Sequence, residues 1–304
     1  MASEIVRELV SAGIHFGHRV SRWNPKMKPF IFGKRNTIHI IDIRETIKGL
    51  LRAKRFITQL VGGGKDILFV GTKRQARPHI VEQAMRVGMP YVAERWLGGT
   101  LTNFATIRSR LTRMDELEKA VADGTALEYS KKMISSRARE LRKITRNLQG
   151  IREMSKMPGA VVVVDVHREM NAVREAKKLG IPTICLIDTD SDPDFADLPI
   201  PGNDDAMRGI GMILGHLADA VEEGLRGRTA QKETTDDESE PKKRSRRPVL
   251  GRADSEPEPA ATSEAPRGEG ATPISTGGEG SDAPSPADKP DLTPASAPDT
   301  KTMS

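Results

Sequence analysis

Short apolar runs alternate with amphipathic segments along residues 1–228. The runs that predict buried strands are residues 37–41, 66–70, 91–93, 160–164 and 183–187. The helical spacing of apolar positions predicts helices over residues 44–61, 74–87, 169–179 and about 204–224. Continuous apolar strands joined by amphipathic helices are typical of a parallel sheet covered on both faces. The pattern therefore predicts an α/β fold with a doubly wound, five-stranded parallel sheet.

A long insertion, residues 103–157, interrupts this alternation. Its apolar positions repeat every seven residues, at Ile107, Met114 and Val121 and again at Ile134, Leu141 and Leu148. A turn at Asp123 and Gly124 separates the two series. Two helices with heptad patterns around one turn predict an antiparallel coiled-coil helical hairpin. Because it is inserted between two strands of a compact sheet, the hairpin is expected to protrude.

The composition of the chain changes at residue 229. Residues 229–304 contain 11 of the 20 prolines and none of the 11 aromatic residues. A segment of this composition cannot build a hydrophobic core, so it is predicted to be a disordered, low-complexity tail. The predicted domains are an α/β core of residues 1–102 and 158–228, the hairpin of residues 103–157, and this tail.

The positive charge is concentrated in the part that is predicted to fold. Residues 229–304 carry 10 Lys and Arg against 15 Asp and Glu, which leaves 38 basic and 27 acidic residues, net +11, in residues 1–228. A folded body of this charge favours a polyanionic partner, and nucleic acid is the first candidate. On charge alone, a basic soluble protein without such a partner remains the alternative.

Cysteine usage and hydropathy indicate where the protein works. The single cysteine, Cys185, lies in an apolar run and is predicted to be a buried core residue. No disulfide can form within the chain, which fits a reducing compartment. The chain starts without an apolar signal stretch and contains no apolar run of about 18 residues. We therefore expect a cytoplasmic protein that does not cross a membrane.

Residues 95–104 form a joint between the third predicted strand and the hairpin. The adjacent glycines Gly98 and Gly99 stand between Trp96 and the start of the helix. No Cys, His, Asp or Glu follows Arg95 until Asp115. The joint therefore has a structural character and offers no catalytic group.

Two glycine-containing segments invite a phosphate-binding interpretation. Residues 62–66 fail it, because they precede a strand, lack the first glycine of a P-loop, and have Asp66 where Ser or Thr should hold magnesium. Gly71-Thr72-Lys73-Arg74 follows a strand and opens a helix, so its backbone N–H groups are able to hold a phosphate. Without a Gly-x-Gly-x-x-Gly motif a dinucleotide is disfavoured, and an RNA phosphate suits this segment equally well.

The sequence gives little support for a metal-binding site or for an acid–base catalytic site. Alternate aspartates at positions 188–194 resemble the start of a calcium loop, but Pro193 and Pro199 occupy the positions that need Gly and Glu. His15 and His18 are weak zinc candidates, because a zinc site needs three or four ligands and no cysteine lies nearby; packing or RNA contact is favoured for them. An acid–base pair of Asp165 with His167 lacks a partner nucleophile in the sequence. No catalytic residue and no cofactor are predicted.

The basic residues are better organised and fall into two groups. The first group surrounds Trp23, Phe30 and Phe32, a mixture that suits phosphate contact together with base or ribose stacking. Its members are Arg19, Arg22, Lys26, Lys28, Lys34 and Arg35. Lys73, Arg74 and Arg95 are further candidates for RNA contact.

The second basic group follows one face of the second hairpin helix. Lys132, Arg139, Lys143 and Arg146 lie three, four or seven residues apart, and Arg142 lies beside them. A solvated helix face normally mixes both signs of charge, but residues 131–152 contain only one acid, Glu140. This favours a phosphate-binding stripe over an ordinary solvated face.

Several segments, in order over residues 3 to about 226, together resemble the family of bacterial small-ribosomal-subunit protein two. After the opening helix they are residues 12–18, 23–27, 38–42, 69–73, 95–104, 188–193 and 200–206. Any one of these strings could arise by chance, but the ordered set is highly specific. The long tail departs from the family pattern, and no function is carried over to it.

The resemblance implies a flavodoxin-like sheet with a protruding coiled-coil hairpin and a structural, non-enzymatic role. It implies binding to small-subunit ribosomal RNA at the body–head junction and contacts with neighbouring small-subunit proteins. One of these is the large multi-domain protein that helps to load messenger RNA. The alternative is a phosphate- or nucleotide-handling enzyme on a doubly wound fold, since fold alone does not decide function.

Overall fold

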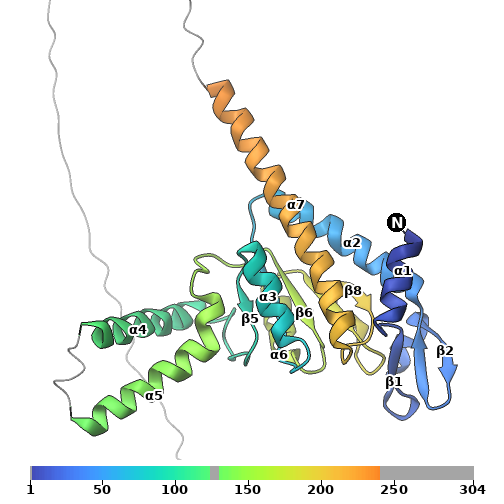
Figure 1. Cartoon of the computed structure of the whole chain (residues 1–304), viewed down its shortest axis with the longest axis horizontal. Coiled ribbons are helices and arrows are strands. Elements are labelled where there is room, and N and C mark those ends of the chain that lie inside the picture. The colour runs from blue at the N-terminus through green and yellow to red at the C-terminus, as the bar shows by residue number, and fades with distance from the viewer. Residues whose placement is uncertain (1, 124–129, 240–304) are drawn as a thin grey trace, which may run out of the picture. The chain divides into compact units, whose positions relative to one another are not determined.

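A five-stranded parallel sheet forms the centre of the described part of the chain (Figure 1). The computed structural model describes residues 2–123 and 130–239. In chain order the strands are β4 (Ile67–Val70), β5 (Tyr91–Val92), β6 (Ala160–Val164), β7 (Thr183–Ile187) and β8 (Leu198–Pro201). They pair in the order β5-β4-β6-β7-β8, and every neighbouring pair is parallel. This is the flavodoxin-like order, which reverses between β4 and β6, so the predicted fold class is confirmed.

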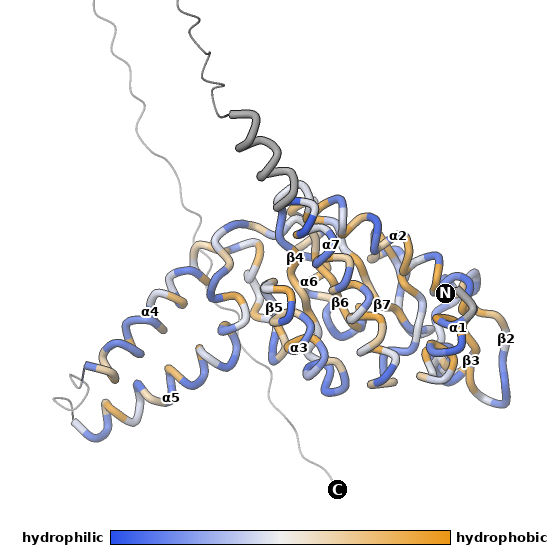
Figure 2. The backbone as a smooth tube through the Cα atoms, turned by 45° about the horizontal axis from the view of Figure 1, so that its top comes forward, coloured by the Kyte–Doolittle hydropathy of each residue, from blue (hydrophilic) through white to orange (hydrophobic). Residues whose placement is uncertain are grey.

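Helices cover both faces of this sheet. Alternate residues of each strand point to opposite faces, and the two resulting hydrophobic clusters lie on either side. One cluster joins the sheet to α2 (Ile43–Gly62), α3 (Arg77–Val87) and α7 (Met207–Ser239), with Leu9 of α1 (Ala2–Ser11). The other joins it to α6 (Met170–Lys178), the joint at residues 95–104 and the base of the hairpin. Figure 2 shows the apolar colour concentrated in the sheet strands.

A small antiparallel sheet precedes the parallel one. Its strands β1 (Phe16–Arg19), β2 (Ile31–Arg35) and β3 (Ile38–Ile41) pair in the order β1-β3-β2. The short 3-10 helices η1 (Val20–Arg22) and η2 (Pro25–Phe30) connect β1 to β2. Asn36 turns the chain between β2 and β3 with φ of 55°, a left-handed conformation that asparagine tolerates.

This small sheet corrects the predicted membership of the parallel sheet. The strand predicted at residues 37–41 does form, but as β3 it pairs only with β1 and β2. The fifth parallel strand is β8, which the sequence pattern did not predict because Pro199 and Pro201 interrupt it. A strand that contains proline is tolerated at the edge of a sheet, and β8 pairs on one side only, with β7.

The inserted hairpin consists of α4 (Phe104–Ala122) and α5 (Lys131–Leu148), followed by the 3-10 helix η4 (Gln149–Ile151). Figures 1 and 2 show it extending beyond β5, at the edge of the sheet opposite β8. Of the predicted heptad positions, Ile107, Met114 and Leu148 are buried, whereas the side chain of Val121 is 62% exposed. Apolar packing between the helices is therefore strongest near the sheet. Residues 124–129, where the predicted turn continues, lie outside the described residues.

The last described element, α7, is longer than predicted. It continues past Gly224 to Ser239, beyond the position at which the tail was predicted to begin. The predicted disorder of residues 240–304 lies outside the described residues. No helix in the described ranges is long and apolar enough to span a membrane.

Candidate RNA-binding surfaces and the charged edge of the sheet

Charged side chains gather where the parallel strands end. Lys73 follows β4, and its ammonium Nζ lies 2.7 Å from Asp204 Oδ1, 2.7 Å from Asp205 Oδ1 and 3.6 Å from Asp165 Oδ2. Burial lowers the pKa of Lys73, but these carboxylates outweigh it and raise the pKa overall. Burial and the charges of Asp165 and Asp188 raise the pKa of Asp204 to about 7, against the opposing effect of Lys73.

In the segment that was predicted to hold a phosphate, residues 71–74, the first three residues are closed from within, whereas Arg74 is exposed. Glu169 Oε1 accepts hydrogen bonds from the backbone N–H of Thr72 at 2.9 Å and from its hydroxyl at 2.5 Å. Burial raises the pKa of Glu169, and the bonds from Thr72 oppose that effect. The side chain of Lys73 is only 13% exposed among its carboxylates. Neither Thr72 nor Lys73 therefore offers a surface to a phosphate, and the predicted RNA contact of Lys73 is not supported.

His18 joins the same edge of the sheet. Its Nδ1 lies 3.0 Å from Asp188 Oδ2, and this contact, despite opposing burial, raises the pKa of His18 to about 9. Ligand atoms of His18, Asp188 and Asp204 all lie within 4.8 Å of one another. One imidazole and two carboxylates are donors that a divalent cation accepts, although Lys73 already neutralises Asp204. His15, the other predicted candidate, is not in this group, and its ring lies tilted against that of Phe16, with 4.1 Å between the ring centroids.

An N-terminal basic surface forms on the antiparallel sheet and its connections. It consists of five exposed residues, Arg19, Arg22, Lys28, Lys34 and Arg35. Lys26 was predicted with them, but its ammonium binds Asp192 at 2.9 Å and Asp194 at 2.5 Å. Lys26 therefore anchors the aspartate-rich loop after β7.

Aromatic residues accompany the N-terminal basic surface in different ways. The half-buried ring of Trp23 has its centroid 5.1 Å from that of the His39 ring, so it packs against β3 of the small sheet. Phe30 is also partly buried, whereas the side chain of Phe32 is 79% exposed. Phe32 is thus the aromatic side chain of this region that is most open to a partner.

The basic residues predicted on the second hairpin helix lie on α5 and are called the hairpin stripe below. Its members Lys132, Arg139, Arg142, Lys143 and Arg146 are all exposed. Arg139 and Arg142 donate to backbone oxygens of Ser135 and Ala138 on their own helix, at 3.3 and 3.2 Å. Within the described ranges, only Arg146 of the stripe has a carboxylate partner, which is Glu94. The stripe therefore presents cationic groups that the described residues leave largely unneutralised.

The joint between β5 and α4 is held by one acid, Glu175 of α6. Its carboxylate accepts the indole N–H of Trp96 at 3.0 Å and the backbone N–H groups of Gly99 at 2.8 Å and Leu101 at 3.0 Å. Burial raises the pKa of Glu175, but these hydrogen bonds outweigh it, so the pKa is lowered. Arg95 at the start of the joint remains exposed. Glu175 thereby sets where α4 begins.

With this geometry in place, comparison with known proteins identifies the family. A family model described as "Ribosomal protein S2" matches residues 9–224, from the end of α1 into α7. The chain belongs to the ribosomal protein S2 family. The match covers the sheet, the hairpin and both basic surfaces, so the resemblance inferred from the ordered motifs is confirmed.

Individual members of the family are similar over most of their length. A protein named small ribosomal subunit protein uS2 from Rhodopirellula baltica is 62% identical over 221 residues, which cover 73% of this chain and 85% of the relative. Proteins of the same name from Syntrophobacter fumaroxidans and Acidothermus cellulolyticus are 50% and 48% identical, over 79% and 86% of this chain and 87% and 93% of their own. Membership of the S2 family gives the chain a structural role and excludes the enzyme alternative.

Sequence reasoning missed the acids that organise this S2-family site. Glu94, Glu169 and Glu175 each receive hydrogen bonds from residues far away in the chain; Glu175, for example, lies 79 positions from Trp96. The only signal available was their position beside predicted strand ends or on the predicted helix of residues 169–179. Such a position does not reveal the partner of an acid until the order of the strands is known.

Proposed function

We propose that this chain is a structural constituent of the small ribosomal subunit, working in the cytoplasm, and that it binds small-subunit ribosomal RNA through two separate basic surfaces. The observation that carries this proposal is the hairpin stripe, in which Lys132, Arg139, Arg142 and Lys143 have no carboxylate partner among the described residues. The N-terminal basic surface is the second contact. Lys26 and Lys73 are left out of the proposed set, because their ammonium groups are paired internally.

The proposed mechanism is electrostatic docking combined with a fit of shape. Each Lys or Arg that neutralises a phosphate releases condensed counterions, so the affinity for RNA should fall steeply as salt rises. Side chains cannot read the deep major groove of an RNA helix, and recognition of double-stranded RNA therefore depends mainly on shape and backbone. Recognition of the shape of folded RNA, with little reading of its base sequence, suits a structural ribosomal protein.

The placement of the two surfaces supports contact with two separate RNA segments. The helix α5, which carries the hairpin stripe, lies beyond β5, and the antiparallel sheet lies near the β8 edge (Figure 1). The parallel sheet thus acts as a spacer between them. Two linked contacts on one chain raise the overall affinity, because the second binding event becomes intramolecular.

We also propose that the antiparallel sheet is the face that docks the large multi-domain, messenger-RNA-binding ribosomal protein. The support is an apolar groove of about 380 Å³ between α1, the small sheet and α2, lined by Val10, Phe32, Ile40 and Ile43. Phe32 and Val10 are 79% and 43% exposed. Exposed apolar side chains gathered around a groove are typical of a protein contact.

Sedimentation of the tagged chain from a cell lysate, before and after a high-salt wash, tests RNA binding in the subunit. We expect stoichiometric migration with small subunits that disappears at high salt. A variant in which Lys132, Arg139, Lys143 and Arg146 are replaced by Gln should dissociate at lower salt. A control with Arg52, Arg55, Arg174 and Lys178 replaced by Gln loses the same charge from α2 and α6. Equal behaviour of the two variants would remove the hairpin stripe from the proposal.

Capture of the messenger-RNA-binding protein tests the proposed docking face on the antiparallel sheet. Phe32→Ser should reduce its recovery with the tagged chain, while small-subunit RNA is retained. Leu51→Ser changes a side chain on α2 that is 50% exposed, and should leave recovery unchanged. If Phe32→Ser recovers as much of that protein as the wild type does, the docking face lies elsewhere.

A further inference from the structure

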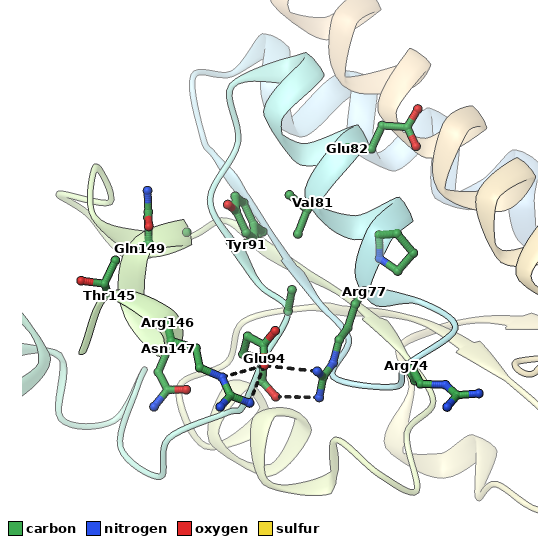
Figure 3. Close-up of a pocket in the computed structure, with 13 residues that line it drawn as sticks. Arg74, Arg77, Val81, Glu82, Tyr91, Glu94, Thr145, Arg146, Asn147 and Gln149 are labelled. Carbon is green, nitrogen blue, oxygen red and sulfur yellow. Dashed lines mark hydrogen bonds and ion pairs between the residues drawn. The ribbon is translucent and has the colours of Figure 1, made fainter. Parts of the chain in front are cut away.

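A groove of about 710 Å³ separates the hairpin from the α/β body (Figure 3). On the body side, its wall is formed by Arg74, the first turns of α3 with Arg77, and Tyr91 of β5. On the hairpin side, the end of α5 contributes Arg146. Glu94, just after β5, lies between the two walls. The groove therefore brings Arg77 and Arg146, from two parts of the fold, to one acid, and Arg74 also lines its body side.

A single carboxylate oxygen links the two walls. Glu94 Oε2 accepts hydrogen bonds from Arg146 Nε at 3.0 Å and Nη2 at 2.9 Å, and it lies 3.2 Å from Arg77 Nη1. Arg77 is fixed independently, because its Nε donates to the backbone oxygen of Thr72 at 3.0 Å. Glu94 Oε2 thus receives two donors from Arg146 on one side and one donor from Arg77 on the other, an arrangement that also suits an anionic oxygen from outside.

The ion pairs of Glu94 are partly open to solvent. The side chain of Arg146 is 68% exposed, and those of Arg77 and Glu94 are each 33% exposed. Ion pairs that touch water contribute little stability, so another anion can replace the carboxylate at small cost. Arg74 is exposed and has no carboxylate partner in the described ranges. The groove therefore contains one arginine, Arg74, that is available to an anion even while Glu94 still holds Arg77 and Arg146.

We propose that this groove binds a phosphodiester of the RNA backbone, which takes the place of Glu94 at Arg77 and Arg146 while Arg74 contacts the same strand. The guanidinium fork matches the two non-bridging oxygens of a phosphate. Tyr91 and Val81 line the same groove and provide an apolar wall for the ribose. The inference rests on the proposed function, because it names a further contact with the same RNA.

The exchange gives Glu94 a definite role. Without RNA, Glu94 holds Arg77 and Arg146 in position across the groove and prevents the two cations from repelling each other. When RNA is bound, its phosphate joins Arg77 to Arg146 more strongly than the carboxylate of Glu94 does. Glu94 therefore competes with the ligand, and its removal should strengthen RNA binding. A purely structural link would behave in the opposite way, because its removal would loosen the hairpin.

The test measures binding of the full chain to small subunits from which this protein has been removed by a salt wash. Glu94→Gln keeps the shape of the side chain and removes the competing charge. We expect its dissociation constant to fall by about two- to fivefold, the range that corresponds to an exposed ion pair. Glu116→Gln removes the same charge from an exposed position on α4 and should bind as the wild type does. Weaker binding of Glu94→Gln, or binding equal to that of Glu116→Gln, overturns the proposal.

The arginines provide the second measurement. Replacing Arg77 and Arg146 together by Gln should weaken binding. It should also reduce the magnitude of the negative slope of log affinity against log salt by about 1 for each phosphate that is no longer neutralised. Thermal unfolding of each variant reports whether the body remains folded. If the wild type itself fails to bind the stripped subunits, the proposed function fails. If it binds with a normal salt slope that the groove variants leave unchanged, only the groove inference fails.

Discussion

Gly150 of η4 lies directly against the backbone oxygen and the ring of Tyr91 in β5. A Cβ atom built on Gly150 overlaps that oxygen and lies 2.7 Å from Tyr91 Cδ2. Because η4 follows α5 without a break, this contact fixes the end of the hairpin against the edge of the parallel sheet. The hairpin therefore meets the body through backbone packing at Gly150 as well as through the ion pairs of Glu94.

Replacing Gly150 by Ala should test this packing. The added methyl group must displace β5 or η4, and overpacking of this kind costs about 1–3 kcal/mol of unfolding free energy. Gly98→Ala is the matched control, because a Cβ at Gly98 meets no atom within 4 Å. Urea unfolding followed by circular dichroism measures both variants. Equal midpoints would show that the hairpin yields at this contact without cost.

The joint before α4 should depend on Glu175 in a similar way. Glu175→Gln keeps the shape of the side chain but replaces one carboxylate oxygen by NH₂, so either the donors at Oε1, Trp96 and Gly99, or those at Oε2, Leu101 and Thr102, lose their acceptor. Leaving such donors unpaired costs about 1–3 kcal/mol. The variant should unfold earlier, and the indole N–H resonance of Trp96 should shift. Glu153→Gln, an exposed acid after the hairpin, should change neither observable.

The lowered pKa of Glu175 also predicts a dependence of stability on pH. A carboxylate with a folded-state pKa below its unfolded value stabilises the protein above that unfolded value, near 4.5. This contribution is lost as pH falls through the folded-state pKa. The difference in unfolding free energy between wild type and Glu175→Gln should therefore be constant from about pH 6 to about pH 5 and shrink below it. A difference that stays constant down to about pH 3 would contradict the assigned role.

The strands of the sheet were predictable from the sequence because burial on both faces demands continuous apolar runs. Residues 160–164 and 183–187 became β6 and β7 with the predicted bounds. β8 escaped prediction because Pro199 and Pro201 are unfavourable in a strand except at an edge, and edge position is a property of the finished sheet. Local pattern thus identified β4, β5, β6 and β7 but not the edge strand β8.

The candidate site was predictable only where one helix carries it. The hairpin stripe depends on spacing along α5, where the four residues predicted to share a face, and Arg142 beside them, are all exposed. Lys26 and Lys73 looked equally available in the sequence, but their partners Asp194 and Asp204 lie 168 and 131 positions away. Whether a lysine is free to bind RNA or paired with an aspartate depends on the order of the strands, and composition and spacing do not reveal that order.

The part of the chain after α7 should add nothing to the stability of the body. Among the residues whose burial the structure describes, the last buried hydrophobic one is Val221, and the match to the S2 family ends at residue 224. Deleting residues 240–304 therefore removes none of the core identified in the described ranges. Calorimetry of the truncated chain should give the unfolding temperature of the full chain within about 1 °C. A large decrease would show that the deleted segment packs on the body.

Lys26 and Lys28 are two positions apart and should differ in their effect on RNA binding. Lys26 is held by Asp192 and Asp194, whereas Lys28 has no carboxylate partner among the described residues. The slope of log affinity against log salt is negative, and Lys28→Gln should reduce its magnitude by about 1, as expected when one phosphate is no longer neutralised. Lys26→Gln should leave that slope unchanged, because its charge is already neutralised within the protein. Salt titration of binding to stripped small subunits measures both variants, and an equal decrease in slope would place Lys26 on the RNA after all.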